Sequence, residues 1–185
     1  MRRALLLTAL LCAYGAFAFR GIARGALQRG AFDPLLPQAR AVEQRIGDTR
    51  FAEALPVALE LQHAYPTEPL VAYWLARIHH GLNNSAAEAE AWEQYVALSP
   101  APSDACPAWP QAYTRLHRAE QAVSTYERCV RLAPEDADLL MDLGDDYAAR
   151  GRRDDARAAF ERAARLEPDN PLPGRRLAAL RETAP

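Results

Sequence analysis

The sequence predicts an all-α fold, an α-solenoid in which three to four helix pairs stack in chain order. Three observations predict it. Proline recurs at equal intervals, at Pro66, Pro100, Pro134 and Pro168, and a fixed period of this length is typical of stacked repeat proteins. The chain is rich in alanine and has only nine glycines, which favours helices. Apolar residues also recur every three or four positions, as they do on one face of a helix.

The composition excludes several classes of function. All 22 basic residues among the 185 are arginine, so Schiff-base chemistry and a phosphate-binding loop with its lysine are excluded. The segment 1–30 holds five arginines and none of the 24 acidic residues, so the rest of the chain is net acidic. Such a surface is poorly suited to nucleic acid, whose binding depends on neutralising phosphates. The high content of Arg, Ala and Pro indicates GC-rich coding and favours a bacterial source.

Residues 1–30 are predicted to form an N-terminal signal or transmembrane anchor segment with a hydrophobic helix. Two arginines follow Met1, and residues 4–19 carry no charge, which is typical of an export signal. Two fates remain open. Retention would anchor the chain through residues 4–23 in a bacterial inner membrane, with the repeats in the periplasm; cleavage near Ala18 would leave it soluble in the periplasm. We expect retention.

Residues 31–185 are predicted to form the repeat domain. Its repeats are expected at about 36–66, 67–100, 104–134 and 135–168, with a C-terminal capping helix over 173–183. In the first repeat, Gly47 and Asp48 predict the turn between two helices, and Pro56 predicts a kinked or shortened second helix. In the second repeat, Ser85 is predicted to cap the second helix, and Glu88 stands where a small residue is expected.

The third and fourth repeats follow the same plan. The first helix of the third repeat is predicted to start late, near Pro107, so that Pro110 lies in its first turn, where a missing N–H is tolerated. In the fourth repeat, Gly151 predicts the turn and Pro168 the end of the second helix. The residues that recur on the facing sides of its two helices are Leu140, Leu143, Gly144, Tyr147, Ala156, Phe160 and Ala163.

These spacings resemble the tetratricopeptide repeat (TPR) family, whose pattern places a bulky residue, Leu-Gly, Tyr, Ala, Phe, Ala and Pro at matching positions. The resemblance implies a right-handed superhelix whose concave face, formed by the first helix of each pair, holds a protein partner. We expect no cofactor, and no metal because the sequence contains no His-x-x-x-His or His-Glu-x-x-His motif. The basic clamp that holds acidic C-terminal tails in chaperone-binding members is absent. Carried onto this sequence, the partner-binding face would consist of Tyr73, Arg77, His80, Gln111, Thr114, Arg115, Asp138, Met141 and Asp145.

The sequence leaves two alternatives open for the role of the acidic residues in the fourth repeat. The stretch after Pro134 carries Asp136, Asp138, Asp142, Asp145 and Asp146 on one predicted helix. These acids form either a solvated surface or a contact surface for a basic partner. Their spacing does not match a calcium loop, which needs a turn centred on glycine.

Cys106 and Cys129 are predicted to lie at the same open end of one helical pair, since the first is near the start of one helix and the second near the end of the next. We expect them to form a disulfide; the alternative is two buried free thiols. A disulfide would indicate an oxidising compartment and would support export.

Together these features predict a non-catalytic interaction scaffold tethered to a membrane, acting as an accessory subunit or assembly factor of a membrane protein complex. The alternative is a periplasmic maturation chaperone for exported clients, similar to the TPR factors of cytochrome c assembly. No catalytic set of Ser, His and Asp, nucleotide-binding loop or paired-carboxylate cleft stands out in the sequence. We therefore do not expect an enzyme.

Overall fold

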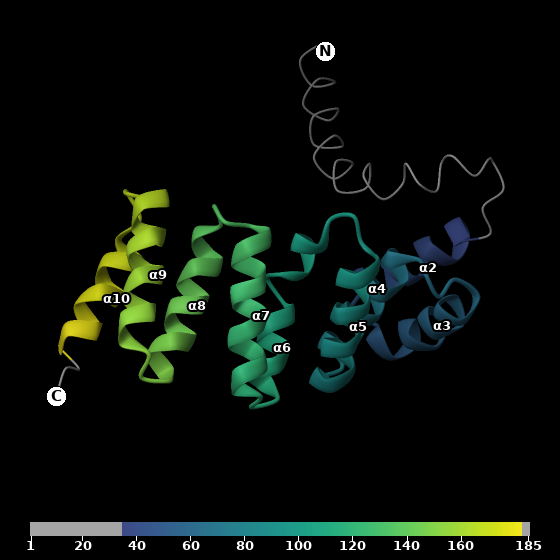
Figure 1. The fold of residues 1–185 in the computed structure, drawn as a ribbon. Coiled ribbons are helices and arrows are strands. Elements are labelled where there is room, and N and C mark those ends of the chain that lie inside the picture. The colour runs from purple at the N-terminus through teal and green to yellow at the C-terminus, as the bar shows by residue number, and fades with distance from the viewer. Residues whose placement is uncertain (1–34, 183–185) are drawn as a thin grey trace, which may run out of the picture.

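A computed structural model describes residues 35–182, and these residues form nine α-helices and one short 3-10 helix without any strand (Figure 1). The predicted all-α class is therefore confirmed. The elements are α2 (Leu35–Gly47), α3 (Phe51–Ala64), α4 (Pro69–Gly81), α5 (Ser85–Leu98), η1 (Pro102–Ala105), α6 (Trp109–Arg115), α7 (Ala119–Leu132), α8 (Ala137–Ala149), α9 (Arg153–Leu166) and α10 (Pro171–Glu182).

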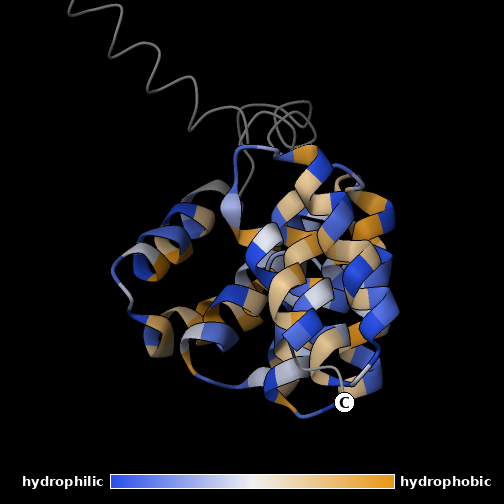
Figure 2. Cartoon of the chain, turned by 90° about the vertical axis from the view of Figure 1, so that its left-hand side faces the viewer, coloured by the Kyte–Doolittle hydropathy of each residue, from blue (hydrophilic) through white to orange (hydrophobic). Residues whose placement is uncertain are grey.

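The helices stand side by side in chain order, from α2 and α3 at one end to α10 at the other (Figure 1). Within each pair the two helices pack together, and the second helix of a pair also packs on the first helix of the next. One continuous cluster of buried residues runs from Ala39 in α2 to Phe160 in α9. Looking along the stack from its carboxyl-terminal end, Figure 2 shows hydrophilic and hydrophobic residues alternating around the helices, as expected when each helix buries one side.

Small residues allow the two helices of the fourth repeat to approach closely. Ala156 and Ala163 on α9 are fully buried, and a Cβ atom added at Gly144 on α8 would overlap the ring of Phe160. The turn between α8 and α9 contains Gly151 with a φ of 73°, a left-handed conformation that glycine adopts without strain. The sequence therefore predicted both the close contact and the turn correctly.

The predicted cap of α5 needs correction, and so does shortening of α3, one of the two effects predicted for Pro56. The N-cap of α5 is Asn84, whose side chain accepts a hydrogen bond of 3.3 Å from the backbone N–H of Ala87. The predicted cap, Ser85, is already the first residue of the helix. In the first repeat, α3 runs through Pro56 over 14 residues, the same length as α5. Pro56 is exposed, so its ring is accommodated on the solvent side and the helix is not shortened.

The third repeat has an unusual first helix. α6 has only seven residues, and Pro110 lies in its first turn, as predicted from the sequence. The chain ahead of it forms the 3-10 helix η1, which begins with Pro102. Prolines thus replace the first half of a regular repeat helix with a tighter and more irregular segment.

The predicted location in a bacterial inner membrane is wrong, because the helices of the described residues do not support it. Between residues 35 and 182 no helix combines the length and the apolar character needed to cross a membrane. The longest of these helices have 14 residues, or about 21 Å at 1.5 Å per residue, whereas a bilayer core is about 30 Å thick. The anchor predicted over residues 4–23 and the cleavage predicted near Ala18 lie outside the described residues.

Candidate partner-binding face

Side chains on successive first helices touch one another along the stack. A guanidinium nitrogen of Arg115 on α6 lies 3.4 Å from Nδ1 of His80 on α4. From α6 to α8, the side chain of Gln111 lies near the carboxylate of Asp142 and favours its charged form. Asp145 on α8 accepts two bonds, of 2.8 and 3.0 Å, from the guanidinium of Arg176 on α10. We call the surface formed by the outward side chains of α4, α6, α8 and α10 the first-helix face.

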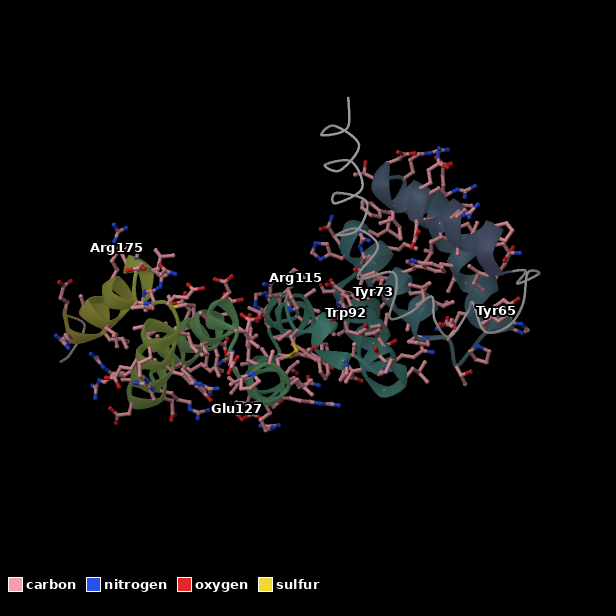
Figure 3. All side chains as sticks on the ribbon, turned by 90° about the horizontal axis from the view of Figure 1, so that it is seen from above. Tyr65, Tyr73, Trp92, Arg115, Glu127 and Arg175 are labelled. Carbon is pink, nitrogen blue, oxygen red and sulfur yellow. A yellow bond between two sulfur atoms is a disulfide. The ribbon has the colours of Figure 1, made fainter. Side chains whose placement is uncertain are left out.

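The links between first helices repeat in register. Gln111 and Asp145 are separated by the same interval as the recurring prolines, and so are their partners Asp142 and Arg176. The same pair of positions therefore joins α6 to α8 and α8 to α10. In the view from above, Tyr73, Arg115 and Arg175 lie along the inner side of the bend in the stack, and Glu127 lies on the opposite side (Figure 3). The first-helix face is thus the inner face of the curved stack.

On α4, the predicted residues form the aromatic end of this face. Tyr73 is half-buried, and its ring meets the rings of Trp92 and Tyr95 on α5 at centroid distances of 5.6 and 5.7 Å (Figure 3). The guanidinium carbon of Arg77 lies 5.7 Å from the centre of the Tyr73 ring, a distance at which a cation is attracted to an aromatic face. Arg77 and His80 are exposed.

On α6, the three predicted residues differ in what they offer a partner. Gln111 and Thr114 are exposed, and the Thr114 hydroxyl donates a 3.3 Å hydrogen bond to the backbone carbonyl of Pro110 in its own helix. Arg115 is held by the second repeat instead. Its Nη2 lies 2.5 Å from a carboxylate oxygen of Glu88, and its Nε donates to the hydroxyl of Ser85 at 3.2 Å.

Glu88 is the residue that best explains the position of Arg115. Its side chain is only 1% exposed, and its other carboxylate oxygen lies 3.2 Å from Nδ1 of His80. A buried carboxylate is costly unless it is paired and hydrogen-bonded. Arg115 and His80 therefore serve first to satisfy Glu88. The sequence marked Glu88 as unusual at a position for a small residue but did not identify these partners.

On α8, the predicted residues form the acidic part of the face. Asp138 is exposed, Met141 is half-buried against the hydrophobic core, and Asp145 is half-buried and paired with Arg176. Asp142 lies among them, and sequence reasoning did not include it in the binding set. Its clearest signal in the sequence is its place four residues after Asp138, one helical turn along the same side.

Two tyrosines join consecutive repeats through a repeated contact. The Tyr113 hydroxyl donates to the carboxylate of Glu93, and the Tyr147 hydroxyl donates to that of Glu127 at 2.7 Å. Burial first, and then the hydrogen bond to glutamate, raises the pKa of each tyrosine to about 12. Both phenols remain protonated donors at neutral pH, so these links stabilise the stack and are not available to a partner.

The two cysteines predicted to pair are both buried, Cys106 directly after η1 and Cys129 near the end of α7. Their Cα atoms are 5.3 Å apart, and the structure records a bond between the sulfur atoms. This spacing is typical of a disulfide. The bond would fasten the irregular segment ahead of α6 to α7, and its presence in the protein remains a prediction that is tested below.

Comparisons with known proteins identify the repeat. Two models of the tetratricopeptide repeat match the chain, one over residues 111–136 and one over residues 137–170. This chain contains tetratricopeptide repeats. The prediction from the sequence is confirmed for the family, and it was carried by the spacing of residues that pack α8 against α9. A search of curated proteins found no match.

Solved structures of TPR proteins share the fold along most of the chain. MamA from Desulfovibrio magneticus RS-1, in a form described as residue 41 to the end, is 17% identical with a TM-score of 0.71, covering 83% of this chain and 86% of that one. TTC0263 from Thermus thermophilus is 28% identical with a TM-score of 0.55, over 80% and 81%. YrrB, a TPR protein with an unusual peptide-binding site, is 13% identical with a TM-score of 0.68, over 79% and 75%.

Proposed function

We propose that this protein is a non-catalytic scaffold that holds a protein partner on its first-helix face, as an accessory subunit or assembly factor of a complex. TPR proteins mediate protein–protein interactions, and their fold is typically non-catalytic. The observation that carries the proposal is the register of the links from Gln111 to Asp142 and from Asp145 to Arg176. These links align the outward side chains of three helices on one continuous surface.

This surface also has the chemical variety that a specific partner requires. It offers the half-buried ring of Tyr73 at one end, the thioether of Met141 near the middle, and charges of both signs between them. Aromatic residues, methionine and arginine are enriched at protein interfaces. The neighbouring structures of MamA and YrrB support the scaffold role through the fold alone.

The test is a comparison of two matched variants of the full chain in affinity capture from its native cells. The first variant, R77A/T114A, removes one basic and one neutral polar side chain from α4 and α6. The second, R157A/S124A, removes the same two kinds of side chain from the second helices α9 and α7. All four residues are exposed, so both variants should melt close to the wild-type temperature.

We expect one protein to be recovered in a fixed ratio with the wild type and with R157A/S124A, and to be lost or much reduced with R77A/T114A. Equal recovery with R77A/T114A and the wild type, or loss only with R157A/S124A, would place the binding surface elsewhere and overturn the proposal.

A further inference from the structure

The interface between the first and second repeats lacks a hydrogen bond that the next two interfaces have. At the interface of α7 with α8, the Tyr147 hydroxyl donates to the carboxylate of Glu127, and the equivalent tyrosine and glutamate of α6 and α5 make the same bond. The corresponding positions in the first interface, where α3 packs on α4, hold His79 and Leu59. Leucine accepts no hydrogen bond, so the first interface is closed without this link.

His79 and Leu59 are both poorly satisfied by their surroundings. Nδ1 of His79 is buried and has no hydrogen-bond partner among the described residues. Leu59 is 46% exposed, although it is a large hydrophobic residue. Buried polar atoms in native proteins almost always have a partner. The unpaired nitrogen of His79 therefore distinguishes this interface from the later ones, where the tyrosines at the same position are hydrogen-bonded.

Histidine differs from tyrosine because its charge changes in mild acid. The phenols at the later interfaces have a pKa of about 12 and stay neutral, whereas an imidazole titrates near pH 6.5. Burial lowers the pKa of His79, so the closed interface favours the neutral ring. A protonated ring carries N–H groups on both nitrogens, and the N–H at Nδ1 would be buried without an acceptor, which is costly. This cost disappears only when the interface opens and water reaches Nδ1.

The charged groups around His79 do not remove this cost. Glu88 and Glu90 on α5 favour the protonated ring, but burial outweighs them. Arg115 and His80 already bind the two carboxylate oxygens of Glu88, and Glu90 is exposed to water. The helices α2 and α3 also pack against α4, and none of their charged side chains contributes to the pKa of His79. Protonated His79 would therefore have no carboxylate of its own.

We propose that His79 makes the first interface sensitive to acid, so that uptake of a proton from solvent by its imidazole releases α2 and α3 from α4 while the later interfaces stay closed. Because the folded interface lowers the pKa of His79, its full stability is present above the ordinary pKa of 6.5 and is lost as the pH falls below that value. The later interfaces depend on phenols that do not titrate in this range.

Release of the first repeat would change the surface that a partner meets. The first helix of this repeat, α2, contacts α4 directly, and Tyr73, Arg77 and His80 lie on α4. Moving α2 away would therefore alter the α4 end of the first-helix face. This effect adds pH dependence to the scaffold and does not depend on the identity of the partner.

The test is hydrogen–deuterium exchange of the full chain at pH 7.5 and pH 5.5, followed by mass spectrometry. Peptides from α2 and α3 are compared with peptides from α7 to α9 in the same sample. Each rate is divided by the rate of the unfolded chain at the same pH, because chemical exchange itself depends on pH. The variant H79Q replaces the imidazole with an amide that does not titrate, and L59E/H79Y places the glutamate and tyrosine of the later interfaces in the first. The control H63Q removes an exposed histidine from α3 itself.

We expect α2 and α3 of the wild type and of H63Q to lose protection at pH 5.5, while α7 to α9 keep theirs. In H79Q, α2 and α3 should be protected equally at both pH values. L59E/H79Y should also lose the response to acid, and its α2 and α3 should exchange about tenfold more slowly than those of the wild type at pH 7.5, as expected for one added hydrogen bond to a carboxylate.

Equal protection of α2 and α3 at both pH values in the wild type would overturn the inference, and so would a loss in acid that H79Q keeps or that H63Q removes. A loss of protection that extends equally to α7 to α9 would show global unfolding and would also contradict release of the first repeat. Should L59E/H79Y not fold, H79Q and H63Q decide the question without it. The scaffold function is tested separately by R77A/T114A at neutral pH, so either proposal can fail alone.

Discussion

The ion pair between Glu88 and Arg115 allows the link between the second and third repeats to be measured. We predict that Arg115→Ala destabilises the protein by about 2–3 kcal/mol. Removing one partner of a buried pair typically costs about 3–5 kcal/mol because the other charge is left buried without compensation. The smaller figure follows because the Arg115 side chain is 37% exposed and because Nδ1 of His80 remains 3.2 Å from Glu88, so that water and the imidazole offset part of the loss.

The decisive comparison adds a second substitution. The positions equivalent to Glu88 in the third and fourth repeats are Ala122 and Ala156, and both are fully buried. Glu88→Ala should therefore fit this backbone. It removes the buried charge, so the double variant E88A/R115A should be less destabilised than R115A alone, by at least about 1 kcal/mol.

The assay is urea unfolding followed by circular dichroism at 222 nm, with R131A as the control because Arg131 is exposed on α7. R131A should lie within about 0.5 kcal/mol of the wild type. If R115A costs less than about 0.5 kcal/mol, or if E88A/R115A is at least as unstable as the sum of its single variants, Glu88 does not depend on Arg115 and the reasoning is refuted.

Three further predictions concern other parts of the stack. Burial raises the pKa of Asp142 above its ordinary value of 3.8, so the folded protein binds the carboxyl proton more readily and wild-type stability falls as pH rises through the raised pKa. D142N should therefore be more stable than the wild type at pH 7 and should lose this advantage as the pH falls towards 3.8. A constant difference between the two proteins in thermal melts across this range would contradict a raised pKa at Asp142. If the predicted disulfide forms, the intact mass of the protein under non-reducing conditions should be lower by two hydrogens. The free energy of unfolding of C106S/C129S should be lower than that of the wild type by about 3 kcal/mol, as expected for a closed loop of 23 residues. Two free thiols in protein from native cells would contradict the predicted disulfide. Gly144→Ala should destabilise the protein by about 1–3 kcal/mol because the added Cβ would overlap the packed ring of Phe160. Gly174→Ala in α10 should be neutral or stabilising because its added Cβ meets open space. Equal urea midpoints for the two variants would show that the contact between Gly144 and Phe160 is not tight.

The sequence was sufficient for the features that depend on local pattern. The regular spacing of the prolines, the small residue at Gly144 and the turn at Gly151 each impose a constraint that a short segment satisfies alone, and the structure agrees with them. The cap of α5 was misplaced by one residue, since Asn84 and Ser85 are both good caps and only the position at which the helix begins distinguishes them.

Contacts between repeats were harder to predict from the sequence. Glu88 and Arg115 are 27 residues apart, and whether they meet depends on how one hairpin rotates against the next. For the same reason, Arg115 was predicted to contact a partner, yet it is mainly engaged within the stack. The predicted membrane location rested on the hydropathy of residues 4–23 alone. That hydropathy gives no information about the short amphipathic helices that follow.

The most direct test of the scaffold function is site-specific photo-crosslinking in native cells, with benzoylphenylalanine placed either at Met141 on the first-helix face or at Arg157 on α9. We expect the probe at Met141 to form a covalent adduct of defined mass with one protein, and the probe at Arg157 to form none. An adduct that forms equally well from Arg157, or from Arg157 alone, would show that the inner face of the stack is not where this protein holds its partner.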